Sequence, residues 1–234
     1  MSQPAEAPNS ALYESLEPGD VVARLLSENS GSPCITCSFQ AEDVLVLDLL
    51  RRHVPDIPVL FLDTGYHFAE TYRYRDHLVR LWNLNLVNVT PAQTVIDQES
   101  QLGALYRTDA ASCCYRRKVE PLMKALEPFD LWFTGLRREQ SPTRWNLRTL
   151  EHHQLPSGHE LLKISPLAAW EWKQVWDYTV ESGIEHLSLY DLGYRSIGCE
   201  PCTSLPAEGA DARSGRWGGS KLECGIHTFS ARTD

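Results

Sequence analysis

The sequence predicts an α/β protein in which a parallel sheet is flanked by helices. Short apolar runs at residues 34–39, 57–62 and 84–89 alternate with stretches of helical character. Strands that alternate with helices in this way form parallel sheets covered on both faces. With 234 residues, 42% of them hydrophobic, the chain is also long enough and apolar enough for one large domain with a substantial core.

Local patterns predict the first elements in order. Residues 11–26 are amphipathic with helical spacing, 34–39 form a compact β-like run, and 41–50 have helical character again. The same unit recurs, because the apolar run 57–62 leads through an Asp-Thr-Gly turn into a helical stretch that ends near Trp82.

The second half of the chain continues the pattern. Residues 84–89 read as a strand, and more helix follows Pro91. Residues 130–134 are expected to form a strand that delivers a polar loop, and 161–164 a short strand. A helix is expected over 170–182, where the tryptophans are spaced for packing in the core.

The last part of the chain differs from the rest. Glycine-rich residues 209–225 have little periodicity, so no regular element is expected there. We therefore expect a nucleotide-binding domain over residues 1–205 and a flexible C-terminal tail over 206–234.

The cysteines give the strongest chemical signal. Cys113 and Cys114 are adjacent, and a disulfide between them would be strained. Together with Cys199 and Cys202, at Cys-x-x-Cys spacing, they predict a four-thiolate site for zinc or a cubane iron-sulfur cluster. The alternative is that these cysteines act as small buried hydrophobes, which is the favoured reading for Cys34 and Cys37. The lone Cys224, in a Glu-Cys-Gly-Ile-His segment, is expected to be reactive.

Charge and the N-terminal sequence narrow the class of protein. The net charge of −9 argues against nonspecific nucleic-acid binding, which requires a basic surface. The first residues have no targeting pattern and no apolar run is long enough to span a bilayer, so we expect a cytoplasmic enzyme without a membrane partner. Basic residues gather locally and predict a small anionic substrate, although each arginine alone is also compatible with a solvated surface. These basic residues are Arg116, Arg117, Lys118, Arg137, Arg138, Arg144, Arg148, Arg213, Arg216 and Lys221.

Three loops are expected to converge on one cleft. They are residues 38–43, 63–65 and 135–144, and ligands of open α/β sheets bind outside the carboxyl ends of the strands. The chain has neither a Walker P-loop nor a Gly-x-Gly-x-x-Gly motif, which argues against an ordinary kinase or a dinucleotide dehydrogenase. Glu42 and Asp43 would repel a polyphosphate, or else they favour the N-terminus of the helix.

Taken together, these motifs resemble the assimilatory adenylyl-sulfate reductases over nearly the whole chain. The resemblance rests on residues 38–43, 62–65, 113–114, 135–142, 199–202 and 221–227. It implies an adenine-nucleotide α-hydrolase-like (ATP pyrophosphatase-like) fold. It also implies a 4Fe-4S cluster on Cys113, Cys114, Cys199 and Cys202, a set typically absent from relatives that use the 3′-phosphorylated nucleotide. The chain departs from the family at Phe39-Gln40, where many relatives have a glycine, and it lacks a glycine often found before Thr143.

The resemblance also implies roles for single residues. Cys224 would attack the sulfur of adenylyl sulfate, release AMP and carry an S-sulfocysteine, which thioredoxin or a similar dithiol would reduce to sulfite. His227 and Lys221 are candidate cationic neighbours of this thiolate. The residues expected to bind substrate are Ser38, Leu62, Gly65, Lys118, Gly135, Arg137, Arg144, Arg213 and Arg216.

Other functions remain open from the sequence. A reductase of 3′-phosphoadenylyl sulfate, or one of dual specificity, would share Cys224 and the loops. An ATP pyrophosphatase-type adenylating enzyme lacks support, because the glycine-rich pyrophosphate loop is missing. A zinc-stabilised nucleotide-binding module is the non-enzymatic alternative. The sequence is compatible with a homo-oligomer and does not fix the oligomeric state.

Overall fold

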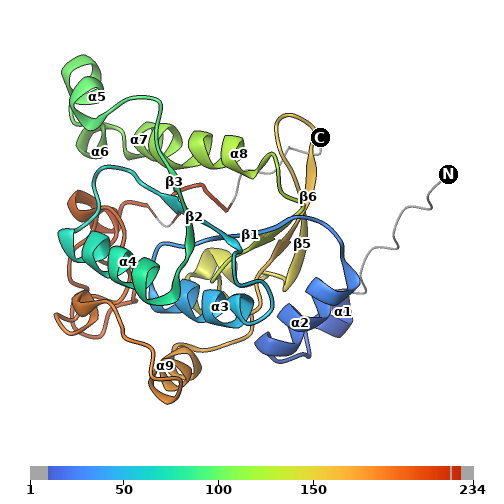
Figure 1. Cartoon of the computed structure of the whole chain (residues 1–234). Helices are drawn as coiled ribbons and strands as arrows, with labels where there is room; N and C mark the ends of the chain where they lie inside the picture. Colours follow the sequence, from blue (N-terminus) through green and yellow to red (C-terminus); the bar gives the residue numbers. More distant parts are fainter. Residues whose placement is uncertain (1–9, 222, 228–234) are drawn as a thin grey trace.

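A computed structural model describes residues 10–221 and 223–227, and at its centre lies a six-stranded sheet (Figure 1). The strand order is β3-β2-β1-β4-β6-β5, and every neighbouring pair is parallel except β5 and β6. The strands are β1 (Pro33–Thr36), β2 (Pro58–Leu62), β3 (Asn85–Val89), β4 (Leu131–Phe133), β5 (Leu150–Gln154) and β6 (Glu160–Ile164). The predicted α/β class with a parallel sheet is therefore confirmed.

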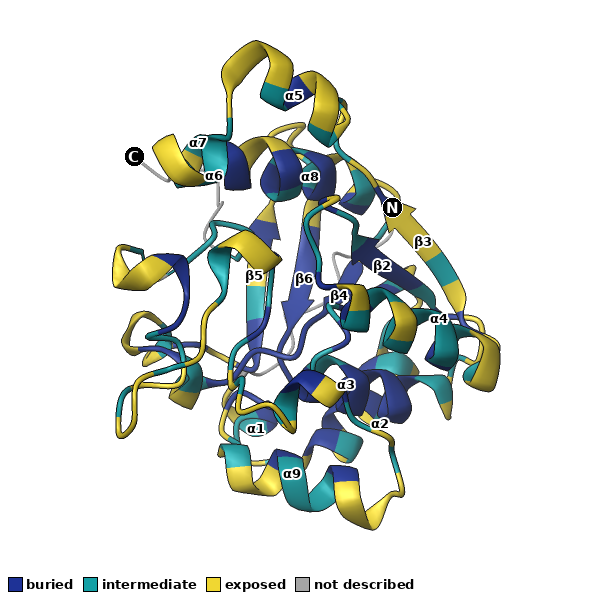
Figure 2. Cartoon of the chain, turned by 90° about the vertical axis from the view of Figure 1, so that its left-hand side faces the viewer, coloured by how far each residue is buried: buried dark blue, intermediate teal, exposed yellow. Residues whose placement is uncertain are grey.

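Helices cover both faces of the sheet (Figures 1 and 2). The α-helices on the described residues are α1 (Ser10–Tyr13), α2 (Pro18–Glu28), α3 (Ala41–Arg51), α4 (Ala69–Trp82), α5 (Val95–Leu102), α6 (Leu105–Thr108), α7 (Ala110–Cys114), α8 (Glu120–Leu126) and α9 (Trp172–Glu181). A π-helical turn, Tyr115–Val119, joins α7 to α8. Within the described ranges, the structure contains no helix with the length and apolar character to cross a membrane.

Side chains alternate along the strands between two hydrophobic cores, as the period of two in a β-strand requires. The core on the α2, α3 and α9 side receives Ile35, Val59, Phe61, Phe133 and Ile164. The core on the α8 side receives Cys34, Leu60, Trp132 and Leu161, which pack with Leu122 and Leu126. Both faces are therefore apolar, and Figure 2 shows β2, β4 and β6 buried while the edge strand β3 is largely exposed.

Two details of the predicted element order were wrong. The single helix expected over 11–26 is split into α1 and α2, because Pro18 has no N–H and starts a new helix. Strand β5 was not predicted, since its Leu-Glu-His-His-Gln sequence lacks an apolar run. The turn at Leu155–Gly158, with its Pro-Ser-Gly sequence, is the signal that marks the hairpin between β5 and β6.

Phe39, where the resemblance leads one to expect glycine, has a glycine-like backbone. Its φ is +60°, in the left-handed region that costs a non-glycine residue about 1–2 kcal/mol. Its ring is fully buried and packs edge-on against Phe61 and Tyr74. Burial of a phenylalanine ring contributes about 1.5–3 kcal/mol, which offsets the strain and keeps this loop in place.

The close approach of α3 to the end of β4 gives a stability prediction. A Cβ on Gly135 would lie 2.8 Å from the backbone N of Asp43 and would clash with the Asp43 carboxylate. We expect Gly135→Ala to lower the free energy of unfolding by about 1–3 kcal/mol, measured by denaturant titration. Gly19→Ala is the control, since its Cβ would meet only Leu49 Cδ2 at 3.9 Å. Equal stability of the two variants would contradict the prediction.

Candidate active site

A cavity of about 620 Å³ opens at the carboxyl ends of β1, β2 and β4. Ser38, Leu62 and Gly135 line it, so the ends of these three strands converge as expected for an open α/β sheet. Gly65 is not among the lining residues. It has a φ of +71°, and a Cβ there would lie 2.7 Å from Val95 Cγ2, so this glycine serves a tight turn.

Asp43, in the first turn of α3, joins the first loop to the third. Its carboxylate accepts hydrogen bonds from the Ser38 backbone N (2.7 Å), the Ser38 Oγ (2.6 Å) and the Gly135 N (3.2 Å). Burial raises the pKa of Asp43 to about 6, despite these hydrogen bonds. Asp43 therefore ties the first loop to the third and stabilises this part of the cavity lining.

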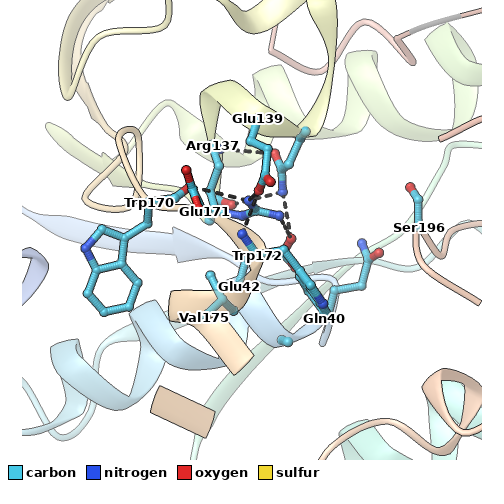
Figure 3. A network of polar contacts seen from close by, with 12 residues as sticks. Gln40, Glu42, Arg137, Glu139, Trp170, Glu171, Trp172, Val175 and Ser196 are labelled. Carbon is cyan, nitrogen blue, oxygen red and sulfur yellow. Dashed lines mark hydrogen bonds and ion pairs between the residues drawn. The ribbon is translucent and has the colours of Figure 1, made fainter. Parts of the chain in front are cut away.

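Arg137 lines the cavity, but its charge is balanced within the protein (Figure 3). It donates to Glu42 Oε1 at 3.0 Å and pairs with Glu139, and its side chain is 4% exposed. Gln140 Nε2 also donates to Glu42 Oε1 at 3.0 Å, and Glu139 accepts from the Trp172 backbone N at 2.6 Å. This network holds the third loop against α9, so the geometry gives Arg137 a structural role beside its predicted contact with substrate.

Three further arginines line the cavity and, with Lys118, give it a cationic wall. Arg144 donates from Nε and Nη2 to the two carboxylate oxygens of Glu223, at 2.8 and 2.7 Å. Arg213 Nη2 lies 3.7 Å from the same carboxylate, and burial lowers the pKa of Arg213 to about 10. Arg216 is buried close to Gly198, where any Cβ would clash with its guanidinium. The structure thus brings three predicted anion-binding arginines to one wall, and it adds Glu223, for which the sequence analysis gave no role.

The tail folds back so that Cys224 lines the cavity. Ile226 packs against the core on the α8 side, and the His227 ring stacks on Trp132 with centroids 5.7 Å apart. Lys163 Nζ donates to the His227 carbonyl at 3.4 Å. The described part of the tail is therefore anchored on both sides of Cys224.

The surroundings of His227, one of the two residues proposed as cationic neighbours of Cys224, disfavour its cationic form. Burial, together with the nearby charges of Lys163 and Arg144, holds the pKa of His227 well below its usual value. The imidazole is therefore neutral near pH 7. Lys221, the other candidate, has its Nζ 5.7 Å from the centre of the Trp217 ring.

The four predicted ligand cysteines lie around a second, smaller cavity. Cys113 and Cys114 end α7, and the turn Glu200–Cys202 presents Cys199 and Cys202 to them. Thr64 Oγ1 lies within hydrogen-bonding distance of Cys199 Sγ, at 3.3 Å. Among the described residues, no group of three or more His, Cys, Asp or Glu side chains is close enough to hold a single metal ion.

Lys118 and Arg216 line both cavities. Burial acts to lower the pKa of Lys118, but the sulfurs of Cys199 and Cys224 outweigh it and raise this pKa. Lys118 comes from the π-helical turn after α7. Its proximity to Cys224 has no signal in the sequence, because only the fold of the tail creates it.

Comparisons with known proteins place the chain in a family. The model of the phosphoadenosine phosphosulfate reductase domain matches residues 32–205, most of the chain. The chain belongs to this reductase family. It is therefore an oxidoreductase that acts on a sulfur group.

Two curated relatives agree with this assignment. The adenosine 5′-phosphosulfate reductase of Mycobacterium tuberculosis is 43% identical over 198 residues, which cover 82% of this chain and 77% of the relative. That of Mycolicibacterium smegmatis is 43% identical over 206 residues, 87% and 86% of the two chains.

Among solved structures, phosphoadenylyl-sulfate reductase from Candida auris has a TM-score of 0.71 at 24% identity, covering 87% of this chain and 99% of its own. FMN adenylyltransferase from Candida glabrata has a TM-score of 0.61 at 12% identity, covering 89% and 68%. These likenesses show the fold, and the predicted adenine-nucleotide α-hydrolase-like class is confirmed.

The raised pKa of Asp43 predicts an unusual pH dependence of this reductase's stability. The folded-state pKa of about 6 exceeds the unfolded value of about 3.9, so the folded chain holds this proton more tightly. The contribution of Asp43 to stability is then fully present below about pH 4 and is lost as the pH rises through 6.

We expect the free energy of unfolding of the wild type, minus that of Asp43→Asn, to fall between pH 4 and 7 in denaturant titrations. The exposed Asp56→Asn is the control and should give a constant difference over the same range. A difference for Asp43 that stays flat or rises with pH would contradict the prediction.

Proposed function

We propose that this reductase converts adenylyl sulfate to sulfite and AMP in assimilatory sulfate reduction, with thioredoxin or a similar dithiol as the electron donor. The observation that carries the proposal is that Cys224 lines the same cavity as the ends of β1, β2 and β4 and the cationic wall. Relatives that are 43% identical and named adenosine 5′-phosphosulfate reductase support this choice of substrate.

Within this proposal the cavity has two functional parts. Ser38, Leu62 and Gly135 would contact the adenine, ribose and phosphate, because they stand at the strand ends that line the cavity. The anionic phosphosulfate would lie against the cationic wall, whose members are Lys118, Arg144, Arg213 and Arg216. Guanidinium groups suit this task, since they bind phosphate and sulfate oxygens in pairs.

The proposed chemistry uses one protein sulfur. The Cys224 thiolate attacks the sulfur of the sulfonate, a bond from Sγ to that sulfur forms, and the bond to the bridging oxygen breaks. AMP leaves with that oxygen and its electron pair, and the cationic wall stabilises the negative charge on its phosphate. One thiolate of the external dithiol then attacks Cys224 Sγ, which breaks the bond to the sulfonate sulfur, releases sulfite and leaves a mixed disulfide. The second thiol of the donor attacks the donor sulfur of this mixed disulfide, closes the donor's own disulfide and frees the Cys224 thiolate. The dithiol thus supplies both electrons.

We also propose that Cys113, Cys114, Cys199 and Cys202 hold a 4Fe-4S cluster. A single zinc ion needs its four ligand sulfurs about 2.3 Å from one point, whereas a cubane binds each cysteine through a different iron. The four cysteines line one cavity together, which supports a shared group with four thiolate ligands, and the resemblance to adenylyl-sulfate reductases favours the cluster over zinc. When bound, the cluster would supply negative charge beside Lys118. Relatives that use the 3′-phosphorylated nucleotide typically lack these four cysteines. Their presence therefore favours adenylyl sulfate as the substrate.

The first test concerns the nucleophile. Cys224→Ser should bind adenylyl sulfate yet form no sulfite, because a serine hydroxyl is a far weaker nucleophile than a thiolate. Wild-type protein given adenylyl sulfate without a dithiol should release one AMP per site and carry a sulfonate on the Cys224 peptide, detected by mass spectrometry.

Cys34→Ala is the matched control, since Cys34 is buried in the core on the α8 side and does not line the cavity. This variant should behave as the wild type. A sulfonate found on Cys34 or Cys37, or AMP release that persists in Cys224→Ser, would overturn the assignment.

The second test concerns the cofactor. Protein purified without oxygen should be brown and contain about four iron and four acid-labile sulfide per chain. Cys113→Ser should lose both the absorbance and the iron, because a four-thiolate site has no spare ligand, while Cys34→Ala should keep them. One zinc per chain with no sulfide would instead support the zinc-stabilised module.

A further inference from the structure

The carboxylate of Glu223 is bound in the same way that an arginine site binds an anionic ligand. Arg144 holds both of its oxygens, at 2.8 and 2.7 Å, and Thr143 Oγ1 donates to Oε1 at 3.0 Å. Arg213 Nη2 lies 3.7 Å from Oε2. The side chains of Glu223, Arg144 and Arg213 are only 13%, 11% and 14% exposed. This is a largely enclosed, two-pronged ion pair.

The pair is electrostatically strong. Burial by itself would raise the pKa of Glu223, but the hydrogen bond and charge of Arg144, together with the charge of Arg213, hold that pKa below its usual value. A planar guanidinium binds a carboxylate and a phosphate or sulfate through the same pair of N–H groups. Arg144 Nη1, outside this pair, is bound to Gln140 Oε1. While Glu223 is bound, the Nε and Nη2 edge of Arg144 is therefore occupied and cannot bind another anion in the same two-pronged way.

We propose that Glu223 occupies the anion subsite of the substrate-free reductase and that the phosphosulfate must displace it to bind. The inference rests on the proposed function for the identity of that anion. Since Glu223 directly precedes Cys224, its release frees the backbone beside the nucleophile. Glu223 is thus a positioning residue that holds Cys224 in the cavity until an anion of sufficient charge replaces the carboxylate.

The other contacts of the tail make this displacement local. Gly225 has a φ of +100°, a backbone conformation that glycine adopts readily. The chain turns here, between Glu223 and Ile226. Ile226 stays in the core on the α8 side and His227 stays on Trp132 when Glu223 leaves its arginines. The exchange therefore costs one ion pair and gains another, and the end of the described tail remains docked.

Glu223→Gln tests the proposal, because it keeps the size of the side chain and removes its charge. In a Cys224→Ser background, which prevents turnover, we expect Glu223→Gln to lower the Kd of adenylyl sulfate about tenfold by calorimetry. With Cys224 present, the KM should fall while kcat stays within about twofold. Thr143→Val, which removes one hydrogen bond to the carboxylate and no charge, should shift the Kd in the same direction by a smaller factor.

A second measurement needs no substrate. Alkylation of Cys224 by iodoacetamide, followed on its peptide by mass spectrometry, should be several-fold faster in Glu223→Gln than in the wild type. The control is Glu208→Gln, which removes the same charge from an exposed position in the preceding loop and should change neither the Kd nor the alkylation rate.

An unchanged or raised Kd together with an unchanged alkylation rate in Glu223→Gln would overturn the inference. Failure of the proposed function would look different. The wild type would then form no sulfite from adenylyl sulfate, while the alkylation rates would still report whether Glu223 holds Cys224 in the cavity.

Discussion

The arrangement of this reductase depends on the need of its enclosed cations for counter-charges. Lys118, Arg144, Arg213 and Arg216 line the cavity, and Lys118 and Arg216 also line the smaller cavity of the four cysteines. Cations withdrawn from water are costly unless anions face them. In the substrate-free chain Glu223 supplies one counter-charge on the cavity side. On the other side, the thiols around Lys118 do so when they are deprotonated. The proposed substrate and cluster would each supply more negative charge to balance these cations.

This constraint explains why the tail returns to the cavity. Residues 223–227 contain one carboxylate, one thiol, one glycine with positive φ, one apolar side chain and one imidazole. The four side chains of Glu223, Cys224, Ile226 and His227 each meet a different surface: the arginines, the cavity, the apolar core and the Trp132 ring, respectively. A short segment with little regular structure is thus fixed by specific contacts, and the nucleophile sits among them.

Much of the fold could be predicted, because the spacing of apolar residues along the sequence differs between strands and helices. The alternation of Cys34 with Ile35, or of Leu60 with Phe61, already assigns each side chain to one face of the sheet. Two features were not predicted. Strand β5 contains two histidines and a glutamate in place of an apolar run, and it pairs only with β6. The other is the break between α1 and α2 before Pro18. The cysteine set and Cys224 could be picked out because few other roles explain their spacing.

The sequence by itself thus determined the class of fold, the strand-end loops and the residue types that carry charge and sulfur. Only the tertiary structure decided how these groups pair: Arg137 with Glu42, Asp43 with Ser38 and Gly135, and Arg144 with Glu223. It also made His227 neutral, by enclosing it near Lys163 and Arg144. The physical reason is that periodicity is a property of neighbouring residues. Burial and charge balance instead depend on segments far apart in the chain, which meet only after folding.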